Sequence, residues 1–359
     1  MQQCICIDAL FLSVLYIVMV TAECNMSCSY CGGSLVTIPR DITYDINRLV
    51  DFIEGNDDNE VVVALYGGEP LLRPGVIHEL LELLPADRFV LQTNGFFIKR
   101  LGDAMHEFDA MLLSIDGRPE VTDACRGDGC HDRVLEAVQF LDENNYEGDR
   151  IARMTATRNT DIYEDTMYLL QFFPHVHWQL DAVWSALWDL QTFQMWTEHS
   201  YLPGIERLAE TWTRHLEQSE VLGIVPFLGI AKRLIWGISG LPCGAGRDAV
   251  TITTDGRVIG CPIAVEFGWN EMGNLSGVQP IDIGAPCTSC NIYSVCGGRC
   301  LFTYKERLWG DEGFDLLCRV TSHLVEQVKT ALPAATALLP DHKDQLYYPL
   351  FNNTTEIIP

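Results

Sequence analysis

The sequence predicts an α/β fold, in which a partial (β/α)6 TIM-like barrel is followed by a small, cysteine-rich domain. Three observations predict it. Short β-rich runs alternate with helical stretches over residues 15–185, a pattern typical of parallel βα units. Half of the 14 cysteines lie in the turn-rich segment 243–318. Three more, Cys24, Cys28 and Cys31, follow the first expected strand.

Apolar and β-branched runs give the expected strands, and helix-like spacing gives the helices between them. The strands are Leu15–Thr21, Val61–Tyr66, Arg88–Leu91, Ala110–Ser114, Ile151–Thr157 and His177–Trp184. The helices are Ile46–Glu54, Val76–Leu84, Asp132–Asn144 and Tyr163–Phe172. In such a barrel the functional loops lie at the C-terminal ends of the strands.

Changes in composition divide the chain into five expected segments. They are an unassigned N-terminal extension (1–13), the barrel (14–205), a helical bridge (206–240), the cysteine-rich domain (241–325) and a C-terminal tail (326–359). A cysteine-rich domain of this size depends on bound metal for its stability.

The formal charge of −25 argues against nucleic acid or an anionic membrane as a partner. An acidic surface is explained either by solubility in a salty cytoplasm or by attraction of a basic peptide. Residues 1–8 contain no Lys or Arg, and the apolar stretch 9–20 has only 12 residues, too few to span a bilayer. We therefore expect a reducing cytoplasm, where clustered cysteines indicate metal rather than disulfides.

The segment from Cys24 to Cys31 reads CNMSCSYC and is followed by two glycines. Three thiolates in this short loop can bind one [4Fe–4S] cluster and leave one of its irons open. The alternative is a structural zinc loop that lacks its fourth ligand.

This loop resembles the CxxxCxφC loop of the radical S-adenosylmethionine (SAM) superfamily. The resemblance implies that SAM binds the open iron and is cleaved reductively to a 5′-deoxyadenosyl radical. The YGGEP segment 66–70 resembles the superfamily's site for the SAM ammonium group, and segments 92–95 and 114–117 resemble those that line the nucleoside and the substrate. Each of these segments also reads as an ordinary turn. The SAM-binding candidates are Tyr30, Gly67, Gly68, Glu69, Asn94, Ser114 and Arg153.

Three charged residues near strand ends are candidates for a role in the chemistry. Asp116 and Asp181 could act as bases, although solvated or capping aspartates are commoner. Arg153 lies within an expected strand, where a buried cation needs a partner; the SAM carboxylate and a carboxylate of the barrel would serve equally well.

The C-terminal cysteines resemble the seven-cysteine pattern of the SPASM domain found in radical SAM peptide maturases. Two zinc ribbons are the alternative, although eight ligands would then be expected. The resemblance implies two auxiliary [4Fe–4S] clusters, one held by Cys287, Cys290, Cys296 and Cys318 and the other by Cys243, Cys261 and Cys300. The second cluster would have three protein ligands, so an open iron there could bind a substrate thiolate before a thioether forms.

Together these resemblances imply a radical SAM enzyme that modifies a peptide or protein, with ferredoxin or flavodoxin as the electron donor. Pro262 follows Cys261. At this position anaerobic sulfatase-maturating enzymes carry an aspartate that acts as a base, so formylglycine formation is the less expected reaction. The open alternatives are a sulfatase-maturase-like oxidation, an enzyme acting on a small molecule, and an iron–sulfur electron carrier without SAM chemistry. The four other cysteines, at positions 4, 6, 125 and 130, are expected to be small apolar side chains.

Overall fold

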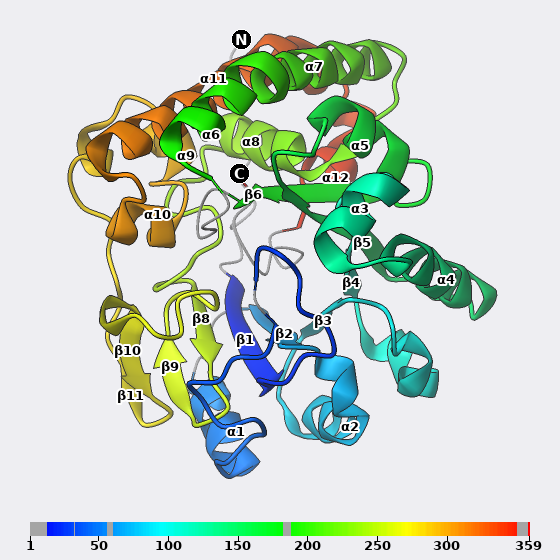
Figure 1. The fold of residues 1–359 in the computed structure, drawn as a ribbon, viewed down its shortest axis with the longest axis vertical. Coiled ribbons are helices and arrows are strands. Elements are labelled where there is room, and N and C mark those ends of the chain that lie inside the picture. Colours follow the sequence, from blue (N-terminus) through cyan, green and yellow to red (C-terminus); the bar gives the residue numbers. More distant parts are fainter. Residues whose placement is uncertain (1–12, 32, 56–59, 182–187, 350–357) are drawn as a thin grey trace.

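One sheet of eleven strands organises the fold (Figure 1). The computed structural model describes residues 13–31, 33–55, 60–181, 188–349 and 358–359. The strands are β1 Ser13–Thr21, β2 Glu60–Gly67, β3 Arg88–Thr93, β4 Ala110–Ser114, β5 Asp149–Ala156, β6 His175–Leu180, β7 Gly223–Ile224, β8 Ala249–Ile252, β9 Arg257–Ile259, β10 Glu271–Asn274 and β11 Gly277–Val278.

The first six strands form the barrel wall that the sequence predicts. Each of β1 to β6 pairs in parallel with the next, and the short β7 extends the wall beyond β6. All six expected strands correspond to observed ones, and the α/β partial barrel is confirmed. The last residues of the sixth expected strand, 182–184, lie outside the described residues, as does nearly all of the segment 1–13.

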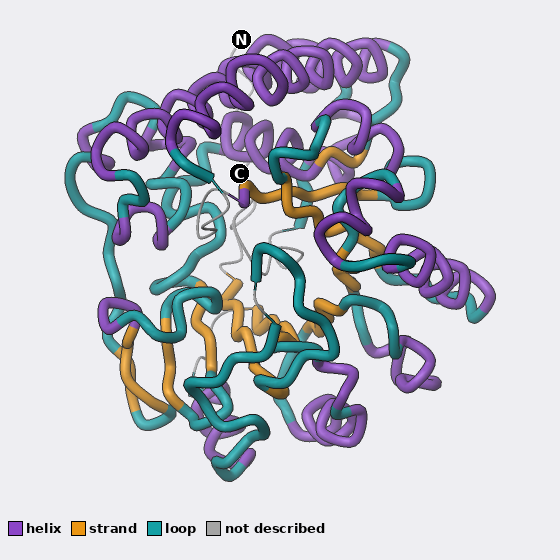
Figure 2. The backbone as a smooth tube through the Cα atoms, viewed as in Figure 1, coloured by secondary structure: helices purple, strands orange, loops and turns teal. Residues whose placement is uncertain are grey.

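Helices cover the sheet and connect its strands (Figure 2). The α-helices are α1 Ile46–Glu54, α2 Pro74–Leu83, α3 Pro119–Arg126, α4 Cys130–Glu143, α5 Ile162–Leu169, α6 Leu190–Trp196, α7 Leu202–Glu217, α8 Val225–Trp236, α9 Tyr293–Cys296, α10 Leu301–Glu306, α11 Gly310–Ala337 and α12 Leu339–Leu346. The segments of 3-10 helix are η1 Pro70–Leu72, η2 Ile98–Glu107, η5 Gly268–Asn270 and η6 Cys287–Ser289, and η4 Thr197–Tyr201 is a π-helical turn. The four helices expected from the sequence correspond to α1, α2, α4 and α5. No helix in the described part of the chain is long and apolar enough to cross a membrane.

The cysteine-rich segment is joined directly to the barrel. Strand β8 pairs in parallel with β1, with Leu15 opposite Ala249, and β9, β10 and β11 continue the sheet as an antiparallel ribbon. Helix α11 packs on α7 and α8. Helices α7 and α11 run through the boundaries expected after residues 205 and 325, and the division into domains stays a prediction. The sheet thus places the turn between β8 and β9 beyond the C-terminal end of β1, where Thr254 O accepts from the Thr43 N–H over 2.9 Å.

The core explains why the barrel strands read as almost unbroken apolar runs. Helices cover the outer face of a parallel sheet, so side chains on both faces are buried. The side chains of Val18, Met19 and Val20 in β1 are fully buried, as are those of Val62, Val63 and others in β2. This rigid wall fixes the strand ends from which the functional loops emerge.

Candidate active site

The two glycines after β2 bring that strand close to the first cysteine loop. The Gly68 N–H donates to Thr21 O over 2.8 Å, and the Glu69 N–H donates to Glu23 O over 2.8 Å. A Cβ at Gly68 would lie 2.2 Å from Glu23 O, and one at Gly67, where φ is +137°, would lie 2.2 Å from Thr21 O. No side chain fits in that space, so glycine at both positions lets the β1–β2 pairing continue into the segment that carries the first cysteine.

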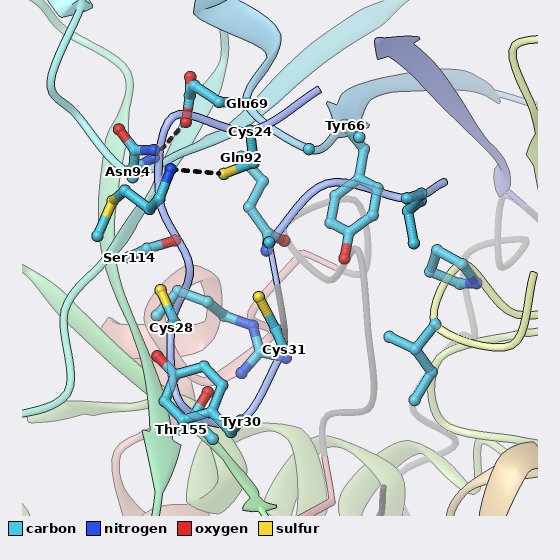
Figure 3. A pocket seen from close by; sticks show the side chains of 18 of the residues that line it. Cys24, Cys28, Tyr30, Cys31, Tyr66, Glu69, Gln92, Asn94, Ser114 and Thr155 are labelled. Atoms are coloured by element: carbon cyan, nitrogen blue, oxygen red, sulfur yellow. Dashed lines mark hydrogen bonds between the residues drawn. The ribbon is translucent and has the colours of Figure 1, made fainter. Parts of the chain in front are cut away.

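Cys24, Cys28 and Cys31 follow β1 and face one cavity (Figure 3). The Met26 N–H donates to Cys24 Sγ over 3.4 Å. A hydrogen bond between the thiols of Cys28 and Cys31 raises the pKa of Cys28 and lowers that of Cys31 to about 6. Burial raises the pKa of Cys24. The loop therefore already directs three sulfur atoms to a common space.

Glu69 braces the ends of two neighbouring strands. Its carboxylate accepts from Thr93 Oγ1 at 2.7 Å, from the Asn94 N–H at 2.8 Å and from the Leu71 N–H at 3.0 Å. The residue is almost fully buried, and burial raises its pKa. Three donors leave this carboxylate one acceptor position for a ligand in the cavity.

Behind the cysteine loop, Tyr30, Asp116 and Arg126 form a buried network. Arg126 holds Asp116 with two hydrogen bonds of 2.8 Å, and the Tyr30 hydroxyl donates to the same carboxylate at 2.8 Å. The Thr155 N–H supplies a further donor at 2.9 Å. Asp116 has no exposed surface, and both of its oxygens are occupied. This arrangement favours a role in positioning the loop over the expected role as a base.

The seven candidate SAM-binding residues line one cavity of about 510 Å³. The three cysteines of the first loop line the same cavity. Asp116 and Asp181 are not among the described residues that line it; Asp181 is buried and accepts from Trp188 Nε1 at 3.0 Å. Arg153 does line it, and donates to Met154 O at 3.1 Å and to the side chain of Gln179. The three thiols, with no fourth cysteine among the described lining residues, fit a [4Fe–4S] cluster that has one open iron.

Four of the C-terminal cysteines surround a second cavity, of about 250 Å³. Cys287 begins η6, Cys290 directly follows it, Cys296 ends α9 and Cys318 lies in α11. Burial raises the pKa of three of these thiols, that of Cys318 to about 11. Four thiols around one small cavity suit a cluster with complete protein ligation.

The three other C-terminal cysteines lie on separate turns. Cys243 lies in the turn before β8, Cys261 in the turn after β9, and Cys300 is the residue before α10. Their binding of one common cluster stays a prediction. Asn270, which the sequence did not single out, fixes the second turn. Its side chain accepts from the Cys261 N–H and donates to Cys261 O and Ala264 O, each at 2.8 Å.

Tyr66 is a further cavity residue that motif reasoning did not assign. Its ring lies in the cavity beside the first cysteine loop (Figure 3). Burial raises its pKa to about 12, and Cys31 and Cys261 both add to this shift electrostatically. The phenol shares this cavity with Cys31 and with Pro262 and Ile263, which follow Cys261 in the chain. Its place directly before Gly67 was the available signal.

Comparison with known proteins decides the family. Residues 18–168 match the family model described as "Radical SAM superfamily". The chain is 33% identical over 275 residues to GTP 3′,8-cyclase of Streptomyces coelicolor, covering 69% of this chain and 77% of the relative. The chain belongs to the radical SAM superfamily. It is also 26% identical over 325 residues to mycofactocin maturase MftC of Mycobacterium tuberculosis, covering 78% of this chain and 76% of the relative.

Two groups of solved structures share the fold of this radical SAM enzyme. The structure of anSMEcpe with bound AdoMet has a TM-score of 0.70 at 17% identity and covers 90% of this chain and 99% of its own. Streptococcus suis SuiB bound to its precursor peptide SuiA has a TM-score of 0.54 at 13% identity and covers 81% of this chain and 72% of its own. As a member of the superfamily, the enzyme uses SAM and a [4Fe–4S] cluster.

Proposed function

We propose that this radical SAM enzyme modifies a peptide or protein. The observation that carries the proposal is the wall of the SAM cavity formed by the cysteine-rich segment. Pro262, Ile263, Phe267 and Phe302 complete the cavity that the strand ends begin, so a substrate must lie between the barrel and this segment. The similarity to mycofactocin maturase extends over 78% of the chain, and SuiB, which shares the fold, is seen with a precursor peptide.

Within this proposal the strand-end residues hold SAM. When bound, the reduced cluster supplies the electron that cleaves SAM to the 5′-deoxyadenosyl radical, which takes a hydrogen atom from the substrate. Cys24, Cys28 and Cys31 would ligate the cluster. The remaining acceptor position of Glu69 would receive the SAM ammonium group, and Arg153 would pair with its carboxylate.

The C-terminal cysteines would hold two auxiliary [4Fe–4S] clusters. The four thiols around the 250 Å³ cavity would complete the ligation of one cluster. Cys243, Cys261 and Cys300 would bind the other and leave it an iron for a substrate thiolate, so that a thioether is one possible product. Ferredoxin or flavodoxin would supply the electrons.

Two other functions have a specific observation in their favour. Formylglycine formation is favoured by the similarity in fold to anSMEcpe. However, Pro262 occupies the position where that reaction needs an acid. A reaction on a small molecule is favoured by the sequence identity to GTP 3′,8-cyclase. However, only two arginines occur among the described lining residues, and one of them, Arg126, is already paired with Asp116, so a triphosphate would lack counter-charges.

Co-expression tests the proposal. The chain is produced together with each short open reading frame that flanks its gene, and the peptides are weighed by mass spectrometry. A mass change that depends on Cys28 supports peptide modification. Unchanged masses for all peptides, in cells whose purified enzyme cleaves SAM, would count against it.

A further inference from the structure

The SAM cavity has walls of two different kinds. The ends of β3 to β6 contribute only polar side chains to it: Gln92, Thr93, Asn94, Ser114, Arg153, Thr155 and Gln179. The cysteine-rich segment contributes only apolar ones to the described lining: Pro262, Ile263, Phe267 and Phe302. The polar wall suits SAM, with its charged amino and carboxylate groups and its ribose. The apolar wall is therefore left to the substrate.

The residues of the apolar wall pack closely on one another and on their neighbours. The rings of Phe267 and Phe302 pack edge to face, with centroids 5.4 Å apart and an interplanar angle of 84°. Trp269 supports both, at 5.9 Å and 6.2 Å. The buried Asn270 side chain closes the turn that carries Pro262 and Ile263 through its hydrogen bonds to Cys261 and Ala264. Among the described residues, this wall therefore presents only apolar side chains to a ligand.

An apolar wall selects among side chains by desolvation. A carboxylate or amide placed against its four described side chains loses water and finds no hydrogen-bond partner among them, whereas an aliphatic or aromatic side chain gains by burial. Because the wall faces the SAM site across one cavity, the residue that packs on it is also the residue within reach of the radical.

We propose that the peptide residue attacked in this enzyme bears an apolar side chain, aliphatic or aromatic, which packs on Ile263, Phe267 and Phe302. The inference rests on the proposed function and names the substrate class of that site. These three residues determine specificity, and the polar strand ends bind SAM.

Binding of matched peptides tests the inference independently of turnover. The probes are pentapeptides in which one variable residue is flanked by glycines, with leucine compared with asparagine and valine with threonine. Isothermal titration calorimetry is performed on the reconstituted holoenzyme with SAM bound. We expect each apolar member to bind at least about tenfold more tightly than its polar partner of similar shape.

Substitutions assign this preference to the wall. Ile263 is half-buried, so Ile263→Lys can be accommodated, and it should reverse the preference toward a peptide with aspartate at the variable position. Phe302→Leu keeps the wall apolar and should keep the preference. Phe172→Leu, at a ring 38% exposed and absent from the cavity lining, is the matched control and should change nothing.

Three results would overturn the inference: equal affinities within each pair, tighter binding of the polar members, or no binding by any peptide to an enzyme that cleaves SAM. The proposed function fails by a different result, namely unchanged peptide masses after co-expression. Tighter binding of apolar peptides together with unchanged peptide masses would therefore support the inference about the wall and count against the proposed function.

Discussion

Removal of the Arg126 guanidinium tests the buried network behind the first cysteine loop. Arg126 ends helix α3, and its side chain is 8% exposed while that of Asp116 is fully buried. Arg126→Met keeps much of the length and the apolar stem but leaves the Asp116 carboxylate without its counter-charge. Breaking a buried ion pair from one side costs about 3–5 kcal/mol, a large part of the 5–15 kcal/mol by which a typical protein is stable.

Urea unfolding of the cluster-free chain measures this cost. We expect Arg126→Met to lower the unfolding midpoint strongly, and Asp116→Asn in the same chain to recover part of the loss, because it removes the uncompensated charge. Arg88→Met is the control. Arg88 is 44% exposed and pairs with Glu60 and Asp109, and such surface pairs contribute less than about 1 kcal/mol.

Two results would refute this reasoning. One is a loss in Arg126→Met as small as that in Arg88→Met. The other is a double variant, Arg126→Met with Asp116→Asn, that is no more stable than Arg126→Met alone. Either result would mean that Asp116 does not depend on Arg126 for its charge balance.

Three further predictions concern the glycine junction, the second cavity and a buried lysine. Gly68→Ala places a methyl group 2.2 Å from a main-chain oxygen and should abolish iron binding at the first loop, whereas Gly75→Ala, with no atom within 4 Å of its Cβ, should leave iron content unchanged. Cys290→Ser should lower the iron of the reconstituted enzyme by about four atoms per chain, as measured by colorimetric assay, and Cys130→Ser should not. Burial lowers the pKa of Lys232 from 10.5 to about 8, so between these pH values the unfolded chain binds the extra proton and stability rises with pH. The unfolding free energy of the wild type relative to Lys232→Met should therefore rise by about 1–3 kcal/mol from pH 8 to 10.5 and be flat below about pH 7; a difference that falls or stays constant from pH 8 to 10.5 would contradict it.

The sequence predicts what local patterns control. The apolar runs of the barrel strands and the cysteine spacing are local, and so the six parallel strands, the first three cysteines and the seven SAM-binding candidates that line the cavity could be predicted. The glycines at 67 and 68 belong to a short motif. Its position directly after an expected strand indicated a SAM-binding segment.

Other features depend on contacts between distant residues. The β1–β8 pairing joins Leu15 to Ala249, and a parallel pairing over that distance leaves no local trace. The pairing of Asp116 with Arg126 could not be predicted, because Arg126 lies on the helix that follows; the role of Asp116 as a base stays a prediction. Asn270 carries no motif, and its role appears only where its amide meets the Cys261 turn.

Deuterium transfer tests the central claim most directly. A peptide whose apolar residues are deuterated at carbon is incubated anaerobically with the reconstituted enzyme, SAM and dithionite. The molecular mass of the 5′-deoxyadenosine is then measured by mass spectrometry. If the radical formed at the Cys24, Cys28 and Cys31 loop attacks the peptide, the 5′-deoxyadenosine is heavier by one deuterium, and Cys28→Ala forms none. Unlabelled 5′-deoxyadenosine beside an unchanged peptide, for every peptide encoded near the gene, would contradict the account.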